Sequence, residues 1–370
     1  MPTTVRAAVC REFSAPLVIE DLTLGDPGPG EVRVRVDAVA ICHSDVSYTD
    51  GEWGGELPAV WGHEAAGRIV EVGSGVGFDV GERVVVTLIR SCGECPRCQR
   101  GAEVACSADF PLDSVSPLSD AEGRAIGHGM RTAAFAEEVV VHASQIVPVD
   151  DDIPAASASL LACGVITGVG AVLNTAQVAP SSTVVVLGCG GVGLNVVQGA
   201  ALAKATTIVA SDPQPTKLDL AIHLGATHAV DPTADDVTAL VRELSGGKMA
   251  DYVFVATGAP AALASADRLV GTMGAIVVVG MPATGIAGQF DPGALAARNQ
   301  RILGSKMGTS VIARDIPRLV ARYHDGGLEL DALVSRRFRL DDINEAMDEV
   351  RSGAALRNVI VFDHHDGNRS

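Results

Sequence analysis

The chain has 370 residues, of which 47% are apolar and 20% charged, and 28 Lys and Arg against 45 Asp and Glu give a formal net charge of −17. This length exceeds one ordinary hydrophobic core, so we expect two domains. The acidic balance repels phosphate backbones and disfavours nucleic acid as a partner. The sequence contains no run of about 18 uninterrupted apolar residues, so it predicts no membrane span. The first residues lack the apolar core of a secretory signal, which predicts a cytoplasmic protein.

The N-terminal part of the chain, up to about residue 150, is typical of short β-strands joined by turns. The stretches that predict strands are 32–39, 68–72, 83–87 and 139–141, and Gly and Pro gather at 26–30 and 73–77. Short strands separated by such turns predict a partly open β-barrel.

After Cys163 the pattern changes to alternating strands and helices. Strands are predicted at Thr183–Leu187, Thr207–Ala210, His228–Val230, Asp251–Val255 and Ala275–Val279, with helical segments between them. This alternation predicts an α/β domain with a doubly wound parallel sheet. Helices near Pro317–His324 and Ile343–Ser352 precede a last strand, Asn358–Phe362, which has no place in the second domain and is expected to return to the first.

A glycine-rich turn follows the first strand of the second domain. Gly188-Cys189-Gly190-Gly191-Val192-Gly193 fits G-x-G-x-x-G and opens an Ala-rich helix. We expect Gly188 to allow the tight turn, Gly190 to let a pyrophosphate approach the backbone, and Gly193 to let helix and strand pack closely. The phosphates would then lie at the helix N-terminus.

Asp212 ends the next predicted strand, 24 positions after Gly188. A carboxylate at this place binds a ribose diol and repels a 2′-phosphate, which favours NAD over NADP. Lys217 is a second candidate for contact with that ribose. The alternative for Asp212 is a turn or helix-capping role ahead of Pro213.

Four cysteines lie within fifteen residues: Cys92, Cys95, Cys98 and Cys106. Two disulfides are the alternative, but the expected cytoplasmic setting disfavours them. Four closely spaced thiolates suit a closed tetrahedral zinc site with a structural role.

A second set of metal-binding residue types is scattered along the chain. Cys42 is followed by Ser44 and Asp45, His63 is followed by Glu64, and Cys163 stands alone. A single buried Cys is usually inert packing. Two Cys and one His together, however, would leave one zinc position open, which is a catalytic arrangement.

The whole pattern resembles the zinc-dependent medium-chain alcohol dehydrogenases. The segment from Gly62 to Gly67, with Gly73 and Val76, matches the zinc signature of that family, and the four-Cys segment and the glycine turn agree with it. The resemblance implies a GroES-like catalytic domain at 1–164 and 307–370 and a Rossmann domain that binds NAD at 165–306. It also implies two zinc ions per chain.

The resemblance assigns roles residue by residue. Cys42, His63 and Cys163 look like the catalytic zinc ligands, Glu64 like a carboxylate near the metal, Asp45 like the residue that orients His63, and Ser44 like the hydroxyl that takes the alcohol proton. Thr167, Val279 and Lys217 fall where the family contacts nicotinamide and adenosine, and His43 and Arg357 where it contacts the pyrophosphate. Trp53, Leu88, Phe110 and Phe135 fall at or near pocket-lining positions, although each could equally belong to the core.

One position departs from the family pattern. Many members carry a histidine at the outer end of a proton relay, where this chain has Ser47. A serine is not a base near neutral pH, so the proton must leave through water or another group. We therefore expect activity to rise with pH and to be stimulated by buffer bases.

The resemblance implies reversible oxidation of small primary alcohols, aliphatic or aromatic, to aldehydes. The runner-up is oxidation of thiol adducts of formaldehyde, although Phe110 stands where glutathione-dependent members carry an arginine. A non-catalytic structural relative and a zinc-free NADPH quinone reductase are disfavoured by the intact ligand set. Members usually assemble as homodimers or homotetramers through strands near Ile302–Gly304.

Overall fold

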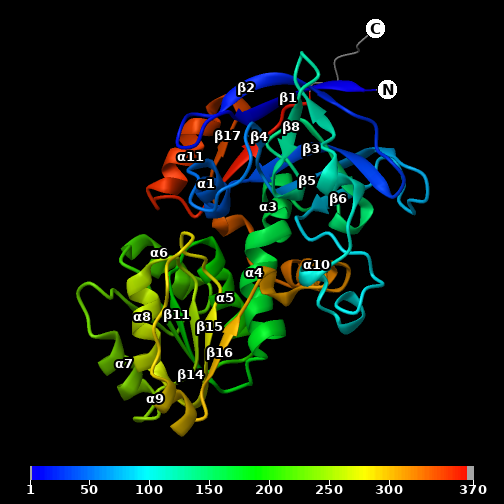
Figure 1. Cartoon of the computed structure of the whole chain (residues 1–370). Coiled ribbons are helices and arrows are strands. Elements are labelled where there is room, and N and C mark those ends of the chain that lie inside the picture. Colours follow the sequence, from blue (N-terminus) through cyan, green and yellow to red (C-terminus); the bar gives the residue numbers. More distant parts are fainter. Residues whose placement is uncertain (1, 365–370) are drawn as a thin grey trace. The chain divides into compact units, whose positions relative to one another are not determined.

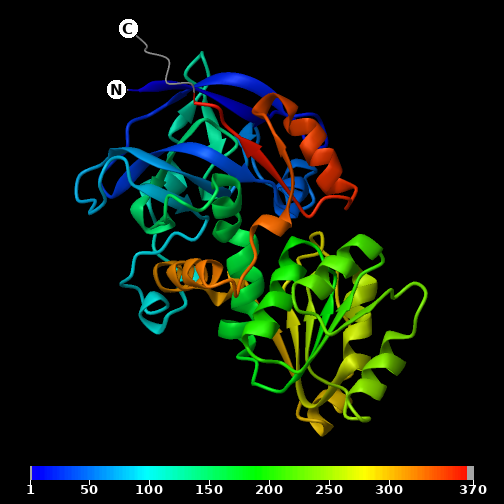
Figure 2. The same ribbon diagram turned by 180° about the vertical axis from the view of Figure 1, so that it is seen from behind.

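A computed structural model describes residues 2–364 (Figures 1 and 2). The chain forms two compact units, one from the residues up to Cys163 and from Val311 onward, the other from Gly164 to Ser310. The predicted boundaries lie one residue and four residues away from these positions. Met1 and residues 365–370, which the prediction placed in the first domain, lie outside the described residues.

The first unit is built from β-strands, as the N-terminal pattern predicts. Five strands close into a small barrel, in the order β1 (Thr3–Cys10), β2 (Val18–Leu24), β7 (Leu118–Ser119), β8 (Ala125–His128) and β4 (Ala59–Val60). A larger sheet has the order β10 (Ile146–Pro148), β6 (Arg83–Val86), β5 (Glu64–Val72), β3 (Glu31–Ala40), β18 (Arg357–Val361) and β17 (Val334–Phe338), and β9 (Glu138–His142) also pairs with β3. Buried valines of β3 and β9 form part of one core with barrel residues.

The last strand returns to the first unit, as expected. In β18, Val359 lies opposite Ala40 of β3 in an antiparallel pair, and β17 adds to its other edge in parallel. This return brings Arg357, the first residue of β18, next to residues from the other end of the chain.

The helices of the first unit are short. They are α1 (His43–Thr49), α2 (Pro111–Ser114), α3 (Ala155–Leu160), α10 (Ile312–His324) and α11 (Ile343–Arg351). Sequence placed the start of α10 near Pro317, but the helix begins at Ile312 because the Asp315 carboxylate accepts the Val311 N–H and completes the first turn.

The second unit is the doubly wound domain that the sequence predicts. Its six strands are all parallel, in the order β13 (His228–Val230), β12 (Thr207–Ser211), β11 (Thr183–Leu187), β14 (Ala250–Val255), β15 (Val270–Val278) and β16 (Arg301–Gly304). The helices are α4 (Ile166–Gly170), α5 (Gly191–Leu202), α6 (Pro215–His223), α7 (Val237–Leu244), α8 (Pro260–Leu269) and α9 (Pro292–Ala297). They flank the sheet in both views (Figures 1 and 2).

A long apolar helical stretch was not predicted. Residues Ala155–Ala176 are helical throughout, with π-helical turns at Leu161–Val165 and Ala171–Ala176. The stretch is apolar and long enough to cross a membrane, but 94% of its most apolar window is buried inside the protein. It is therefore a core helix.

Candidate active site

Four side chains from separate parts of the first unit meet in its interior. The ligand atoms of Cys42, His63, Glu64 and Cys163 all lie within 4.8 Å of one another, and all four residues are buried. Cys42 ends the segment after β3 and caps α1, and Glu64 begins β5. Cys163 lies in the first π-helical turn, so three distant segments supply the cluster.

Asp45 fixes the orientation of His63. The Asp45 carboxylate accepts the Cys42 N–H at 2.8 Å and the Gly62 N–H at 3.0 Å. The His63 Nδ1 lies 3.1 Å from the same carboxylate, which makes Nδ1 the protonated nitrogen. All of these groups are buried, so the tautomer that leaves Nε2 free is strongly favoured.

The donor set fits a zinc ion. Buried polar atoms normally have partners, yet His63 Nε2 and both Glu64 carboxylate oxygens have no hydrogen-bond partner among the described residues. Sulfur and imidazole nitrogen are the ligands that zinc prefers, and three such ligands leave a fourth position open. A metal ion would satisfy the free nitrogen that the protein does not.

A buried arginine balances the negative charge of this cluster. Arg357 is 4% exposed, and its guanidinium lies 3.4 Å from a Glu64 carboxylate oxygen. A hydrogen bond with Cys163 and the charge of Arg357 hold the pKa of the Cys42 thiol well below its usual range. Burial raises the pKa of Glu64 to about 8. The predicted contact of Arg357 with a pyrophosphate stays a prediction.

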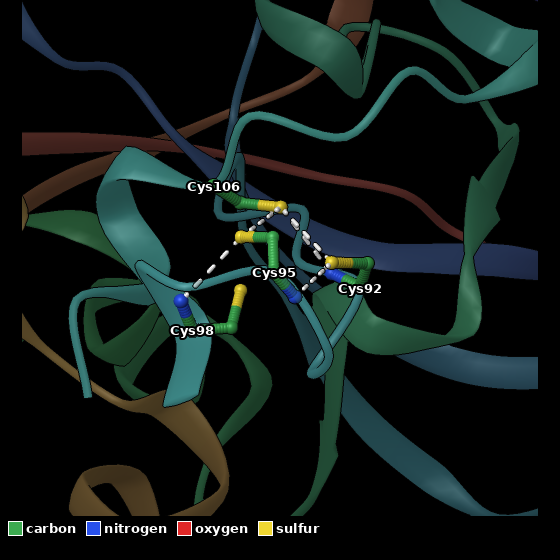
Figure 3. A group of neighbouring side chains, drawn as sticks. All are labelled: Cys92, Cys95, Cys98 and Cys106. Carbon is green, nitrogen blue, oxygen red and sulfur yellow. Dashed lines mark hydrogen bonds between the residues drawn. The ribbon is translucent and has the colours of Figure 1, made fainter. Parts of the chain in front are cut away.

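The four clustered cysteines form a second centre (Figure 3). All of them are free thiols, which excludes the disulfide alternative in this structure. The Sγ atoms of Cys95 and Cys106 are 3.9 Å apart, and those of Cys106 and Cys92 are 3.6 Å apart. A tetrahedral zinc with Zn–S bonds of about 2.3 Å separates its sulfurs by about 3.8 Å, so the spacing fits.

Backbone N–H groups stabilise two of these sulfurs, those of Cys92 and Cys95, as thiolates. The Cys95 N–H donates to Cys92 Sγ at 3.3 Å, and the Cys98 N–H donates to Cys95 Sγ at 3.5 Å. Backbone hydrogen bonds, led by that of Ser107, lower the pKa of Cys95 to about 5. Together the four sulfurs would hold a zinc ion with a closed coordination shell, which would leave no open position for a substrate.

The glycine turn of the second unit has the geometry that its sequence predicts. Gly188 has a φ of +91°, and Gly193 packs so closely that a Cβ there would lie 1.8 Å from the Gly188 carbonyl oxygen. A Cβ at Gly190 would meet nothing within 4 Å, so the backbone there is open to a ligand. The turn leads into α5, whose first N–H groups are free to bind phosphate.

Asp212 connects two turns of this unit. Its carboxylate accepts the Cys189 N–H at 2.8 Å and the Gln214 N–H at 2.9 Å, so part of its role is the turn function that the sequence left open. Lys217, on α6, is 9% exposed. Thr167 lies on α4, where its hydroxyl contacts the Met307 sulfur, and Val279 follows β15.

The predicted pocket residues occupy different environments. Phe135 is 0% exposed and belongs to the hydrophobic core of the first unit. Phe110 packs against His142, with ring centroids 4.8 Å apart, and under the Arg90 guanidinium. Trp53 lies edge-on to Tyr48, and both Trp53 and Leu88 are half-buried. Their contact with substrate stays a prediction.

The remaining predicted residues lie on α1. His43 is exposed, and the Ser44 hydroxyl lies 3.7 Å from Cys42 Sγ. Sequence reasoning missed the partner of Ser47, whose hydroxyl donates to the Glu52 carboxylate at 2.8 Å. The only sequence signal was the closeness of the two residues in the chain.

Comparison with protein families assigns both units. The alcohol dehydrogenase GroES-like domain matches residues 28–151, and the zinc-binding dehydrogenase family matches residues 191–324. The NDMA-dependent alcohol dehydrogenase of Amycolatopsis methanolica is 34% identical, over 96% of this chain and 98% of its own. The chain belongs to the zinc-binding medium-chain alcohol dehydrogenase family. S-(hydroxymethyl)glutathione dehydrogenase of Paracoccus denitrificans is 33% identical, over 96% of this chain and 99% of its own.

Solved structures agree over the whole length. An alcohol dehydrogenase zinc-binding domain protein from Burkholderia ambifaria has a TM-score of 0.93 at 35% identity, covering 98% of this chain and 100% of its own. Benzyl alcohol dehydrogenase from Acinetobacter calcoaceticus has a TM-score of 0.91 at 32% identity, with the same coverage. The zinc-dependent alcohol dehydrogenase is therefore an oxidoreductase with a GroES-like domain and a Rossmann-like domain.

The comparisons also bear on the cofactors. A zinc-binding dehydrogenase from Sinorhizobium meliloti, with a TM-score of 0.82 at 28% identity over 97% of this chain and 100% of its own, is bound to NADP. Acetophenone reductase from Geotrichum candidum, with a TM-score of 0.80 at 26% identity over 98% of each chain, is in complex with NAD. With its two donor sets, this dehydrogenase has two zinc sites.

Proposed function

We propose that this dehydrogenase uses NAD to interconvert primary alcohols, aliphatic or aromatic, and their aldehydes. The observation that carries the proposal is the buried cluster in which Asp45 leaves His63 Nε2 unpartnered beside two thiols. Cys42, His63 and Cys163 are the proposed ligands of the catalytic zinc. Cys92, Cys95, Cys98 and Cys106 are the proposed ligands of the structural zinc.

The residues of the chain prepare the site for alcohol oxidation. When bound, zinc supplies a Lewis acid for the alcohol oxygen, and NAD supplies the hydride acceptor. Asp45 holds the imidazole in one tautomer, and Arg357 offsets the negative charge of the thiolates and Glu64. Ser44 is proposed to take the alcohol proton, since its hydroxyl lies 3.7 Å from Cys42 Sγ at the edge of the cluster.

NAD is proposed in preference to NADP. Asp212 follows β12 at the place where a carboxylate meets the adenosine ribose in such sheets, and it would repel a 2′-phosphate. Two of its lone pairs bind the backbone N–H groups of Cys189 and Gln214, and its remaining lone pairs are available to ribose hydroxyls.

Benzyl alcohol dehydrogenase, at 32% identity, supports an aromatic or similarly apolar alcohol as the substrate. The Paracoccus relative, named for a thiol adduct, supports the runner-up. Phe110 favours the first, because its ring packs against Arg90 and His142 and offers no positive charge to a thiol carboxylate. The proposal includes assembly as a homodimer or homotetramer, supported by the edge position of β16, where Ile302 is 43% exposed.

The test combines zinc content with substrate oxidation. Elemental analysis should give two zinc ions per chain, and NADH should form with primary alcohols in the absence of thiols. Activity only with formaldehyde plus a thiol would favour the runner-up. One zinc ion and no turnover would overturn the proposed function.

Two matched cysteine variants assign the zinc that is lost. Cys163→Ser should retain one zinc ion per chain and lose alcohol oxidation. Cys10→Ser removes a thiol that is also buried but belongs to neither cluster, so it should keep both zinc ions and activity.

A further inference from the structure

A cavity of about 610 Å³ opens in the first unit, apart from the cysteine and histidine clusters. It is lined by residues 14–17, by Thr49 at the end of α1, by Asp50 and Glu52 just after it, and by four residues of α11: Asn344, Met347, Asp348 and Arg351. The cavity is large enough to hold many water molecules. It therefore brings water close to the C-terminal end of α1.

Glu52 links this cavity to a buried hydroxyl. The Glu52 residue is exposed and lines the cavity, whereas Ser47 is only 2% exposed. The Ser47 hydroxyl donates to the Glu52 carboxylate at 2.8 Å, a length at which a proton can pass between oxygens.

The other charged groups that face the cavity have different partners. Arg351, on α11, binds the Asp50 carboxylate through two nitrogens at 2.8 and 3.0 Å. Arg351 also pairs with Asp348. Asp50 and Asp348 are thus held by one guanidinium, while the Glu52 carboxylate accepts from a hydroxyl that points into the protein.

Helix α1 carries this hydroxyl toward the metal-binding cluster. Cys42 caps the helix, and the Ser44 hydroxyl lies 3.7 Å from Cys42 Sγ. Ser47 is three residues after Ser44, and residues with this spacing lie on the same face of a helix with Cβ atoms about 5–6 Å apart. One bridging hydroxyl or water molecule spans such a gap.

We propose that Glu52 is the outer proton acceptor of the dehydrogenase and releases the alcohol proton into this cavity. Oxidation converts alcohol and NAD⁺ into aldehyde, NADH and one proton. The hydride goes to the nicotinamide, a proton passes to the Ser47 oxygen as the Ser47 proton passes to Glu52, and Glu52 loses its proton to cavity water. The proposal rests on the proposed function, and it makes Glu52 the group that replaces a base at position 47.

The test compares Glu52→Gln with wild type. Glutamine keeps an oxygen that can accept from Ser47 but cannot take a proton. With a fluorinated primary alcohol that binds without being oxidised, proton release on mixing with enzyme and NAD⁺ is followed by stopped flow with a pH indicator. We expect Glu52→Gln to slow proton release by about 10-fold or more, and added imidazole to restore it.

Two controls separate proton transfer from local charge and from packing. Asp348→Asn removes the same charge from the same cavity without touching Ser47, so its proton release should match wild type. Ser47→Ala should slow release as Glu52→Gln does, and Ser47→Thr, which keeps the hydroxyl, should restore it. Zinc content and NAD affinity should be unchanged in all four variants.

The outcomes distinguish this inference from the proposed function. Active wild type with unaltered proton release in Glu52→Gln overturns the inference alone. Equal slowing in Asp348→Asn also overturns it, because the effect is then one of charge. A wild-type chain that binds two zinc ions but oxidises no alcohol overturns both.

Discussion

The hydrogen bonds of Asp45 allow the effect of a single substitution to be estimated. One carboxylate oxygen accepts the Cys42 N–H, and the other accepts the Gly62 N–H and the His63 Nδ1–H. In Asp45→Asn, the amide NH₂ must face at least one of these donors. The less costly orientation faces Cys42, and the amide oxygen then keeps the other two bonds with reduced strength.

Two penalties follow from this geometry. A buried N–H without an acceptor costs about 1–3 kcal/mol of folding free energy, and the site is fully buried. The uncharged amide oxygen still accepts from His63 Nδ1 but holds the imidazole less strongly and makes Nε2 a weaker ligand, and mutation of such a partner typically lowers zinc affinity by about 10- to 100-fold. We therefore expect Asp45→Asn to fold with lower stability and to lose one of its two zinc ions first when a chelator is titrated.

The assay is competition with a chromogenic chelator, with unfolding measured in parallel by denaturant titration. Asp315→Asn is a matched control, because Asp315 is also buried and also accepts a backbone N–H but lies on α10. It should lower stability without changing zinc affinity. Zinc affinity within about twofold of wild type in Asp45→Asn would refute the role given to Asp45.

Three further predictions address the other sites. Gly193→Ala should destabilise the second unit, because its Cβ would lie 1.8 Å from a carbonyl oxygen. Gly190→Ala should unfold like wild type but bind NAD about 10-fold more weakly, and unfolding curves together with NAD titration separate the two effects. Cys98→Ser should reduce zinc from two ions to one per chain and lower the unfolding midpoint while the catalytic zinc stays, as elemental analysis and denaturant titration will show. Burial lowers the pKa of His128 to about 4, so the unfolded state binds more protons between about pH 6.5 and pH 4, and the free energy of unfolding falls by about 3 kcal/mol as pH falls through that window. His128→Gln should lack this part of the pH dependence, and the same pH dependence of the free energy of unfolding in both proteins would contradict the assignment.

Much of the second unit could be predicted because its signals are local. The strand expected at Thr183–Leu187 is β11 with the same bounds, and the glycine turn follows it directly. Each glycine of the G-x-G-x-x-G pattern is needed for a local steric reason, so this short pattern alone is enough to predict the turn. The four-Cys cluster is equally local, since fifteen residues supply every sulfur.

The stretch Ala155–Ala176 was missed for a physical reason. A helix that is buried all round has no polar face, so the usual period of apolar residues is absent. Buried Ser157, Ser159 and Thr167 also interrupt the apolar run. Helix α1, with seven residues, is too short to show a period at all.

Contacts between distant segments were also beyond local patterns. Arg357 matched a family position for pyrophosphate, but its pairing with Glu64 depends on β18 returning beside β3, whose other neighbour is β5. The Ser47–Glu52 hydrogen bond needs the turn after α1, where the direction of each side chain is set by the fold.

Helix α1 connects the metal-binding cluster to Glu52, the proposed outer proton acceptor, so both depend on how this helix is held. A seven-residue helix is not stable alone, so tertiary contacts must hold it. Asp45 binds Gly62 at one end, and Arg351 binds Asp50 just past the other. The Arg351 pair is partly exposed and stabilises by at most about 1 kcal/mol.

Of the two contacts that hold α1, the one between Asp45 and Gly62 tolerates substitution less well. It has a φ of +90°, and a Cβ there would lie 2.7 Å from the Phe135 backbone nitrogen and ring, which are fully buried. Gly62→Ala must therefore displace the backbone N–H that Asp45 binds, and with it the start of α1. We expect this variant to weaken zinc binding and to slow proton release together, whereas Arg351→Ala should leave both nearly unchanged. Loss of zinc affinity without any change in proton release would show that Ser47 is held independently of the N-terminal turn of α1.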